Sequence, residues 1–149
     1  MSDIALIPVQ GDFSADFALV GADLLSDQGM DTAIIISLFC DARADPDDEL
    51  PFIGADRRGW WADAYAEIPG DVTGSKLWLL ERGKQIPRTL VRAEQYGRDA
   101  LQWLVDDGVA SAIDVAASFP NLGWLGLEVT VIRPTGPARR HYDYVWKFA

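Results

Sequence analysis

The chain has 149 residues, 49% of them hydrophobic and 24% charged, and a formal net charge of −10. This length and composition indicate one compact domain spanning residues 1–149 and exclude a disordered chain. The negative charge opposes binding to phosphate backbones, so we expect no nucleic-acid partner. No apolar run approaches the roughly 20 residues that cross a bilayer, and the chain starts without a signal-peptide pattern, so we expect no membrane association.

The first thirty residues predict little regular structure. Residues 3–9 alternate weakly between apolar and polar side chains and are followed by Gly11, which indicates one short N-terminal strand. Residues 17–20 are a second candidate strand, and residues 27–29 (Asp-Gln-Gly) indicate a turn.

Residues 30–43 predict the first helix, because their apolar side chains fall on one helical stripe. Three consecutive β-branched residues, 34–36, leave a strand open as the alternative. Cys40, the single cysteine, ends an apolar run and is expected to fill the core.

Residues 45–58 predict a long exposed acidic loop. They contain the structure breakers Pro46, Pro51 and Gly54 and the acidic run Asp47-Asp48-Glu49. Loops of this length in small domains tend to be functional or mobile, so this one is a candidate docking element.

The densest motif is residues 56–63, Asp-Arg-Arg-Gly-Trp-Trp-Ala-Asp. Its candidate residues are Arg57, Arg58, Trp60, Trp61 and Asp63. In one interpretation they anchor the loop, with one indole buried and an arginine paired to Asp56 or Asp63. In the other they form an interface, since Trp and Arg are enriched at binding hot spots. Both interpretations remain open.

The second half predicts a helix and then a sheet. Residues 76–82 are too short to assign. Pro87 suits a first helical turn, apolar residues then recur every three or four positions, and Gly108 suits a C-terminal cap. Residues 113–119, 125–131 and 142–148 alternate with a period of two between turn residues, which predicts a three-stranded antiparallel meander. Its last strand, with Tyr142, Tyr144 and Trp146, is a candidate edge strand. The predicted fold class is α+β, with two main helices packed on this meander.

The sequence offers no motif that defines a catalytic or metal centre. It has no phosphate-binding loop, no Gly-x-Ser-x-Gly turn and no Cys/His metal spacing, so we expect no cofactor, metal or small-molecule substrate. The single histidine, His141, is predicted to be a surface or interface residue. Two carboxylates suffice for a glycosidase, but no spacing among the 23 acidic residues singles out a pair.

Several blocks, in order along the chain, resemble the Mu-like phage baseplate proteins. The most specific are Arg57-Arg58-Gly59-Trp60-Trp61 and Trp103-Leu104-Val105-Asp106-Asp107-Gly108-Val109; the others lie at 32–45 and 74–80. The resemblance covers nearly the whole chain. One departure from the wider group of small wedge proteins is its Glu-Pro-Arg signature, which is Ile86-Pro87-Arg88 here.

The resemblance implies a non-enzymatic component of a contractile tail baseplate in a phage or prophage, made in the bacterial cytoplasm. The implied partners are other baseplate wedge proteins and the tail sheath, whose first ring is laid on strands of such proteins. An exposed edge of the predicted meander suits that contact. The alternative function is a tail-associated peptidoglycan hydrolase. A third interpretation is an acidic inhibitor that mimics DNA, but only residues 45–49 cluster acidic groups.

Overall fold

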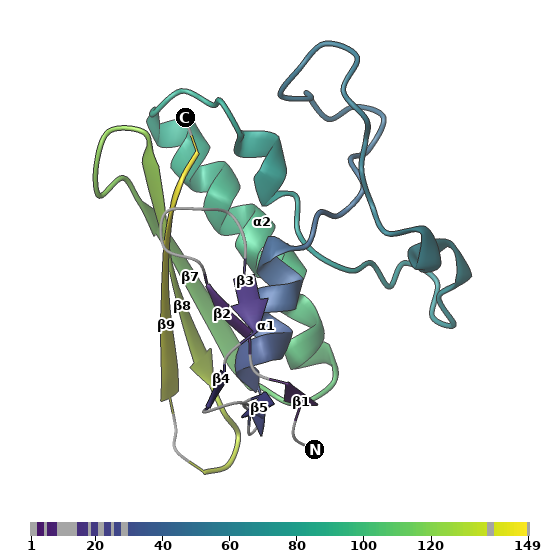
Figure 1. The fold of residues 1–149 in the computed structure, drawn as a ribbon, viewed down its shortest axis with the longest axis vertical. Coiled ribbons are helices and arrows are strands. Elements are labelled where there is room, and N and C mark those ends of the chain that lie inside the picture. The colour runs from purple at the N-terminus through teal and green to yellow at the C-terminus, as the bar shows by residue number, and fades with distance from the viewer. Residues whose placement is uncertain are drawn as a thin grey trace.

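Two helices pack on one face of a three-stranded antiparallel sheet (Figure 1). The computed structural model describes residues 30–136 and 139–148, and short strand segments between residues 3 and 27. The helices are α1 (Met30–Phe39) and α2 (Pro87–Asp106). The α+β class predicted from the sequence is confirmed.

The sheet is the predicted meander, in the order β7 (Ala112–Ser118), β8 (Trp124–Ile132) and β9 (Arg139–Lys147). Along the central strand every second side chain points inward and is fully buried: Leu125, Leu127, Val129 and Val131. Because one face is buried, this alternation also fixes the pairing register. Among the described residues, the strand order places β9 at one edge of this sheet.

Helix α2 begins at Pro87 and ends before Gly108, whose φ of +73° is the left-handed conformation of a C-terminal cap. It lies close to β7, because Gly97 faces the sheet. A Cβ atom at Gly97 would be 3.0 Å from Cγ1 of Val115. The predicted start and cap of this helix are therefore confirmed.

Residues 30–39 form a helix, α1, despite three consecutive isoleucines. The helix ends at Phe39, whereas the sequence predicts an end at Arg43. Its Phe39 ring meets Tyr144 and Trp146 of β9 edge-on, with centroids 5.2 and 5.6 Å away. Trp103 on α2 donates its indole N–H to the Ser37 hydroxyl at 3.0 Å, which ties the two helices together.

The N-terminal strand predicted at residues 3–9 is two short strands. These are β1 (Asp3–Ile4), paired with β6 (Ser26–Asp27), and β2 (Leu6–Pro8), paired with β3 (Ala15–Phe17). A further pair joins β4 (Leu19–Val20) to β5 (Asp23–Leu24). The turn predicted at residues 27–29 extends outside the described residues.

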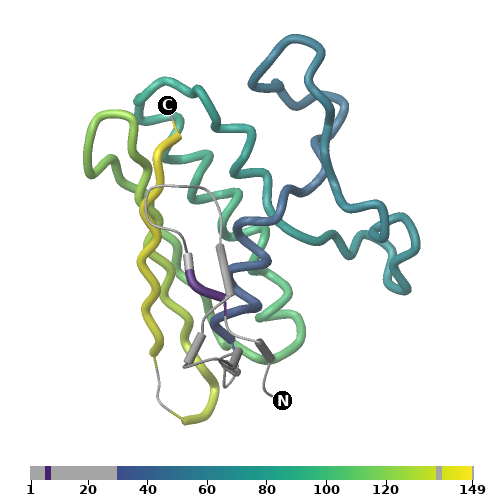
Figure 2. The backbone as a smooth tube through the Cα atoms, in the orientation of Figure 1, coloured from purple at the N-terminus to yellow at the C-terminus, as the bar shows by residue number. Residues whose placement is uncertain are grey.

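Between the two helices the backbone leaves the body and returns (Figure 2). We call residues 45–73 the arm. It contains the short 3-10 helix η1 (Trp61–Tyr65), and a second one, η2 (Leu77–Leu80), follows it in the unassigned segment 76–82. In the described residues, neither α1 nor α2 combines the length and the apolar character of a membrane span.

Candidate interaction site

The base of the arm is a short length of extended chain, residues 40–44. On one side Ser75 accepts from the Ala42 N–H and donates to the Cys40 carbonyl, both at 2.9 Å. On the other side the Ala44 N–H donates to the Arg57 carbonyl at 2.8 Å. These long-range bonds replace helical ones, which is why α1 ends at Phe39.

The early end of α1 changes the environment of Cys40. The prediction that it fills the core is wrong, because its side chain is exposed beyond the last helical turn. Burial of part of the side chain and the neighbouring Asp41 carboxylate raise the pKa of the thiol. A raised pKa disfavours the reactive thiolate.

Two glycines let the chain close tightly around this base. Gly74 has a φ of +93°, and a Cβ there would be 2.3 Å from the Cys40 carbonyl oxygen. Gly59 has a φ of +98°, and its Cβ would be 2.6 Å from Cβ of Arg43. Both positions therefore require glycine for conformation and for space.

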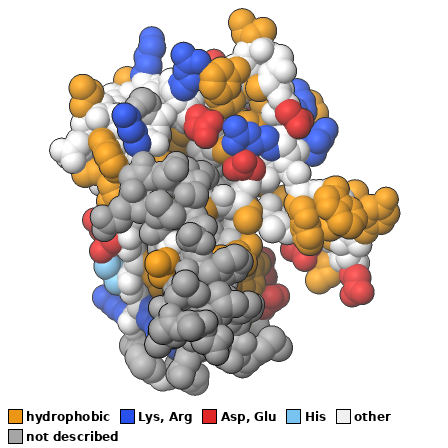
Figure 3. All heavy atoms as spheres, viewed as in Figure 1, with side chains coloured by type: hydrophobic (Ala, Val, Ile, Leu, Met, Phe, Trp, Pro, Cys, Tyr) orange, Lys and Arg blue, Asp and Glu red, His pale blue; other side chains and the backbone are white. Residues whose placement is uncertain are grey.

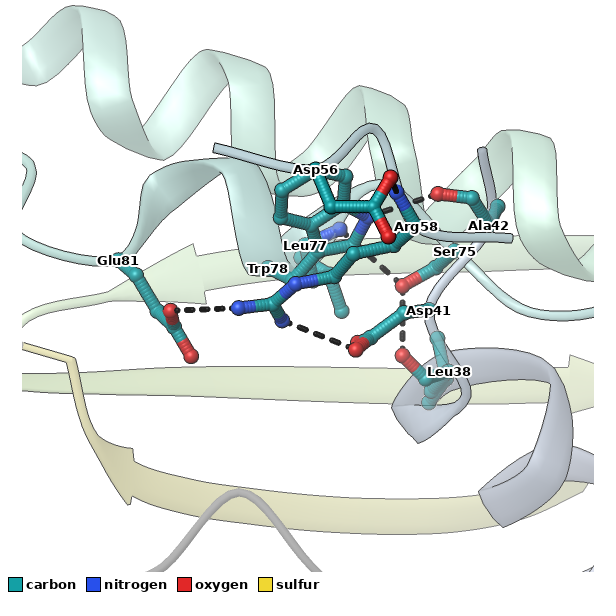
Figure 4. A network of polar contacts seen from close by, with 9 residues as sticks. All are labelled: Leu38, Asp41, Ala42, Asp56, Arg58, Ser75, Leu77, Trp78 and Glu81. Carbon is teal, nitrogen blue, oxygen red and sulfur yellow. Dashed lines mark hydrogen bonds and ion pairs between the residues drawn. The ribbon is translucent and has the colours of Figure 1, made fainter. Parts of the chain in front are cut away.

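The arm is fastened to the body by Arg58, whose guanidinium lies over the Trp78 indole 4.4 Å from the ring centroid. The same guanidinium pairs with Asp41 at 2.9 Å and Glu81 at 3.3 Å (Figure 4). Only about a third of the Arg58 side chain is exposed. A cation–π contact with two ion pairs in this setting holds an arginine more firmly than an exposed pair does.

Arg58 also has a strained backbone, with a φ of +53°. Its N–H donates to the Asp56 carboxylate at 3.3 Å, two residues back. Conformations of this kind cost a non-glycine residue about 1–3 kcal/mol and persist where the surroundings fix them. The stack and the ion pairs of the side chain are such surroundings.

Trp78 is itself immobilised. Its side chain is 1% exposed, and its indole N–H donates to the Ala42 carbonyl at 2.7 Å. Ser75 donates its hydroxyl to the Leu38 carbonyl and accepts from the Leu77 N–H, which fixes the start of η2 (Figure 4). Arg58 therefore binds to a rigid surface.

A second tether joins the acidic loop to Lys76. The Lys76 ammonium contacts Asp45 and Asp48, the latter at 2.8 Å. Burial by itself would raise the pKa of Asp48 and lower that of Lys76. The hydrogen bonds and opposite charges outweigh burial, so the pKa of Asp48 is held below its usual value and that of Lys76 above. Arg57 adds hydrogen bonds to the carbonyls of Asp45 and Pro46.

Beyond these tethers the arm presents aromatic side chains to solvent. Trp60 and Trp61 are 54% and 75% exposed, and Tyr65 is 79% exposed. Trp61 lies between the other two rings, 6.2 Å from each centroid. The expectation that one indole of this pair is buried is wrong; the indole buried beneath the arm is that of Trp78. Figure 3 shows hydrophobic side chains gathered at the outer end of the arm.

The predicted partners of the motif's charged residues also differ. Arg58 pairs with Asp41 and Glu81, not with Asp56 or Asp63. Asp63 accepts hydrogen bonds from the Thr73 backbone N–H at 3.2 and 3.3 Å, so it closes the outer lobe of the arm. The five candidate residues of the motif thus lie together, some as tethers and some as exposed surface.

The candidate edge-strand side chains point inward. Tyr144 and Trp146 are buried. Tyr142 is half-buried and donates its hydroxyl to Asp31 at the start of α1, which also pairs with Arg140. Burial, then the nearby Asp31, raises the pKa of Tyr142. Only the backbone edge of β9 is therefore a candidate for contact with a partner strand.

Among the described residues, the outer face of the sheet carries a group of possible metal ligands, Glu128, His141 and Asp143, whose ligand atoms lie within 4.8 Å of one another. All three are exposed. His141 contacts Asp143 at 3.0 Å and the Thr130 hydroxyl at 3.1 Å. His141 is a surface residue, as predicted. Exposed groups of this kind are common without an ion, so the cluster does not by itself define a metal centre.

The sequence did not point to the residues of the body that hold the Arg58 guanidinium, which are Asp41, Trp78 and Glu81. Nor did it point to a second cation–π contact, in which Arg82 lies 4.9 Å from the centroid of the Phe52 ring. No local pattern marks these residues, because each contact joins residues far apart in the chain. The paired arginines before Trp60 are the only sequence signal that points toward them.

The fold is that of a small α+β domain, in which a tethered, aromatic-tipped segment projects from a helix-on-sheet body. The chain belongs to the family described as phage protein GP46, whose sequence profile matches residues 30–138. It is 45% identical over 136 residues to a protein of Escherichia phage Mu named baseplate protein gp46, an alignment that covers 91% of this chain and 90% of that one. A protein of Haemophilus influenzae named Mu-like prophage FluMu protein gp46 is 46% identical, with the same coverage.

Proposed function

We propose that this chain is a structural, non-enzymatic component of the tail baseplate of a Mu-like phage or prophage, and that its arm is a principal contact with neighbouring wedge proteins. The baseplate role is supported by the near-complete alignment with the phage Mu protein. A baseplate role places the chain in the virion tail, which is the location that the resemblance in the sequence implies.

The observation that carries the role of the arm is the contrast between its base and its tip. The base is held by Arg58 on Trp78 and by Lys76, whereas the tip exposes Trp60 and Trp61. Exposed aromatic side chains are typical of interface hot spots, and a fixed base reduces the entropy lost on binding. An arm built this way is suited to permanent assembly.

The proposed sheath contact rests on the edge strand β9. An edge strand offers backbone N–H and C=O groups to an added strand, and the buried Tyr144 and Trp146 hold that edge firmly on α1. Pro87, in the segment that replaces the Glu-Pro-Arg signature, opens α2 instead. The proposed sheath contact is therefore made by β9 and not by residues 86–88.

The test is a double substitution, Trp60→Ala with Trp61→Ala, in a prophage that makes its own tails. Both side chains are exposed, so we expect the isolated variant to keep its unfolding temperature within a few degrees. We expect it to be missing from purified tails, with a large loss of infectious particles. Leu122→Ala, at another exposed apolar side chain, is the control and should assemble normally. A stable double variant that yields infectious tails would contradict the role of the arm.

The alternative, a peptidoglycan hydrolase, is tested separately with a zymogram. We expect no clearing zone from purified protein that is shown to be folded. A clearing zone that disappears when one pair of neighbouring carboxylates is replaced by amides would favour the hydrolase.

A further inference from the structure

A groove lies between the outer lobe of the arm and helix α2. Its volume is about 660 Å³, and it adjoins a smaller hollow of about 320 Å³ beside α1. The two hollows share residues of the arm, of α2 and Gly74 directly after the arm. These are Asp71, Val72, Gly74, Ala100 and Trp103. We call the combined hollow the arm–helix groove.

The groove combines apolar and acidic lining. Ile68 and Val72 of the arm face Ala100 and Trp103 of α2 across it. Five aspartates also line it, against two cationic residues, Arg43 and Lys76; the aspartates are Asp45, Asp71, Asp99, Asp106 and Asp107. The groove therefore offers apolar contact inside a negative field.

The negative charge of the groove is only partly neutralised within the chain. Lys76 is already paired with Asp45 and with Asp48. Among the described residues, Asp71 and Asp107 have neither an ion pair nor a side-chain hydrogen bond. Two carboxylates on opposite walls are thus available to a cationic ligand.

The walls of the groove are fixed before any partner binds. On the helix side, Trp103 is held by its hydrogen bond to Ser37. On the arm side, Asp63 holds the Thr73 N–H, and the next residue, Gly74, packs against the Cys40 carbonyl. A preformed groove binds a segment without first having to order itself.

We propose that the arm–helix groove binds a segment of another protein chain in which Lys or Arg residues flank apolar ones. This proposal rests on the proposed function, because the partner is then a neighbouring baseplate protein. The apolar residues would pack between Val72 and Trp103, and the cations would pair with Asp71 and Asp107. Nucleic acid is repelled by the same aspartates, and a second copy of this chain brings the same negative charge to the contact.

The experiment is calorimetric titration of the full-length protein with a short synthetic peptide in which lysines flank leucines. A peptide with glutamates in place of the lysines is the comparison. We expect the lysine peptide to bind and to shift the Trp103 indole N–H resonance, and the glutamate peptide not to bind. Asp71→Asn with Asp107→Asn should weaken binding by about fivefold or more.

The control variant, Glu49→Gln with Asp114→Asn, removes the same charge at exposed positions outside the groove. It should bind within about twofold of wild type, since it changes only the distant field. Equal losses in the two variants would overturn the proposal, because the attraction would then be net charge alone. Failure of the lysine peptide to bind would overturn it too.

A photo-crosslinker at Gln102, on the helix wall, tests the partner in assembled tails. We expect a crosslink to a basic segment of a different protein. A crosslink to an acidic segment or to a second copy of this chain would overturn the proposal while leaving the baseplate role intact. Absence of the chain from purified tails would instead contradict the proposed function. The peptide titration would still decide whether the groove binds a basic segment.

Discussion

The guanidinium of Arg58 lies over the indole of Trp78, 20 residues further along the chain, with Cζ 4.4 Å from the ring centroid. This contact joins the arm to the segment that packs under α2. Asp41 and Glu81 pair with the same guanidinium from either side. Arg58, whose own backbone is strained, is therefore one of the tethers that position the exposed tryptophans.

Replacing Arg58 by alanine should loosen the arm while leaving the body folded. The variant loses the stack and both ion pairs, and we expect the Ala44 amide, which is bonded to the Arg57 carbonyl, to exchange about tenfold faster, equivalent to about 1.4 kcal/mol. Native-state hydrogen exchange measures this. Arg88→Ala, at an exposed arginine of α2, is the control. An unchanged rate at Ala44 in Arg58→Ala would show that the anchor is dispensable.

Gly70 in the arm and Gly74 directly after it allow backbone strain and steric conflict to be measured separately. Gly70 and Gly74 both have positive φ, but only Gly74 faces a neighbouring atom, the Cys40 carbonyl oxygen. Gly70→Ala should lower the free energy of unfolding by about 1 kcal/mol, from strain alone. Gly74→Ala should lower it by at least about 1 kcal/mol more, because the carbonyl must also move. Urea unfolding measures both, and equal losses would mean that the base of the arm is not closely packed.

The ion pairs of Lys76 predict how the stability of the arm depends on pH. The pKa of Asp48 is lowered in the folded protein, so its contribution is present above about pH 4 and is lost as pH falls through the folded pKa. The pKa of Lys76 is raised, so its contribution is present below about pH 10 and is lost as pH rises through the folded pKa.

Lys76→Met should therefore be less stable than wild type by a constant amount between about pH 5 and pH 9, of roughly 1 kcal/mol for a partly exposed pair. The difference should narrow on both sides of that range. Urea midpoints across pH in the two proteins measure it. If the stability difference between the two proteins changed strongly between about pH 6 and pH 8, its assignment to the Lys76–Asp48 pair would be contradicted, because neither group titrates there.

The sheet and α2 were predictable because their signals are local. Alternation along β8 reports which side chains are buried, and all four inward residues predicted there are buried. Pro87 and Gly108 mark the two ends of α2 through backbone chemistry that depends on one residue each. Such features need no knowledge of distant contacts.

The arm was predictable only as an exposed loop. The end of α1 and the exposure of Cys40 depend on hydrogen bonds to Ser75, 35 residues away from Cys40. In the same way, the sequence does not reveal that Trp78 is buried while Trp60 and Trp61 are exposed, because the contacts of Trp78 with Ala42 and Arg58 join residues far apart in the chain. Tertiary contacts of this kind override local tendencies.

The most direct test of the central claim, that the arm binds other baseplate chains, is hydroxyl-radical footprinting of the free protein and of purified tails. We expect Trp60 and Trp61 to be oxidised readily in the free protein and to be strongly protected in tails, while the buried Trp78 reacts little in either. Equal oxidation of Trp60 and Trp61 in both samples, with the chain present in the tails, would contradict the claim.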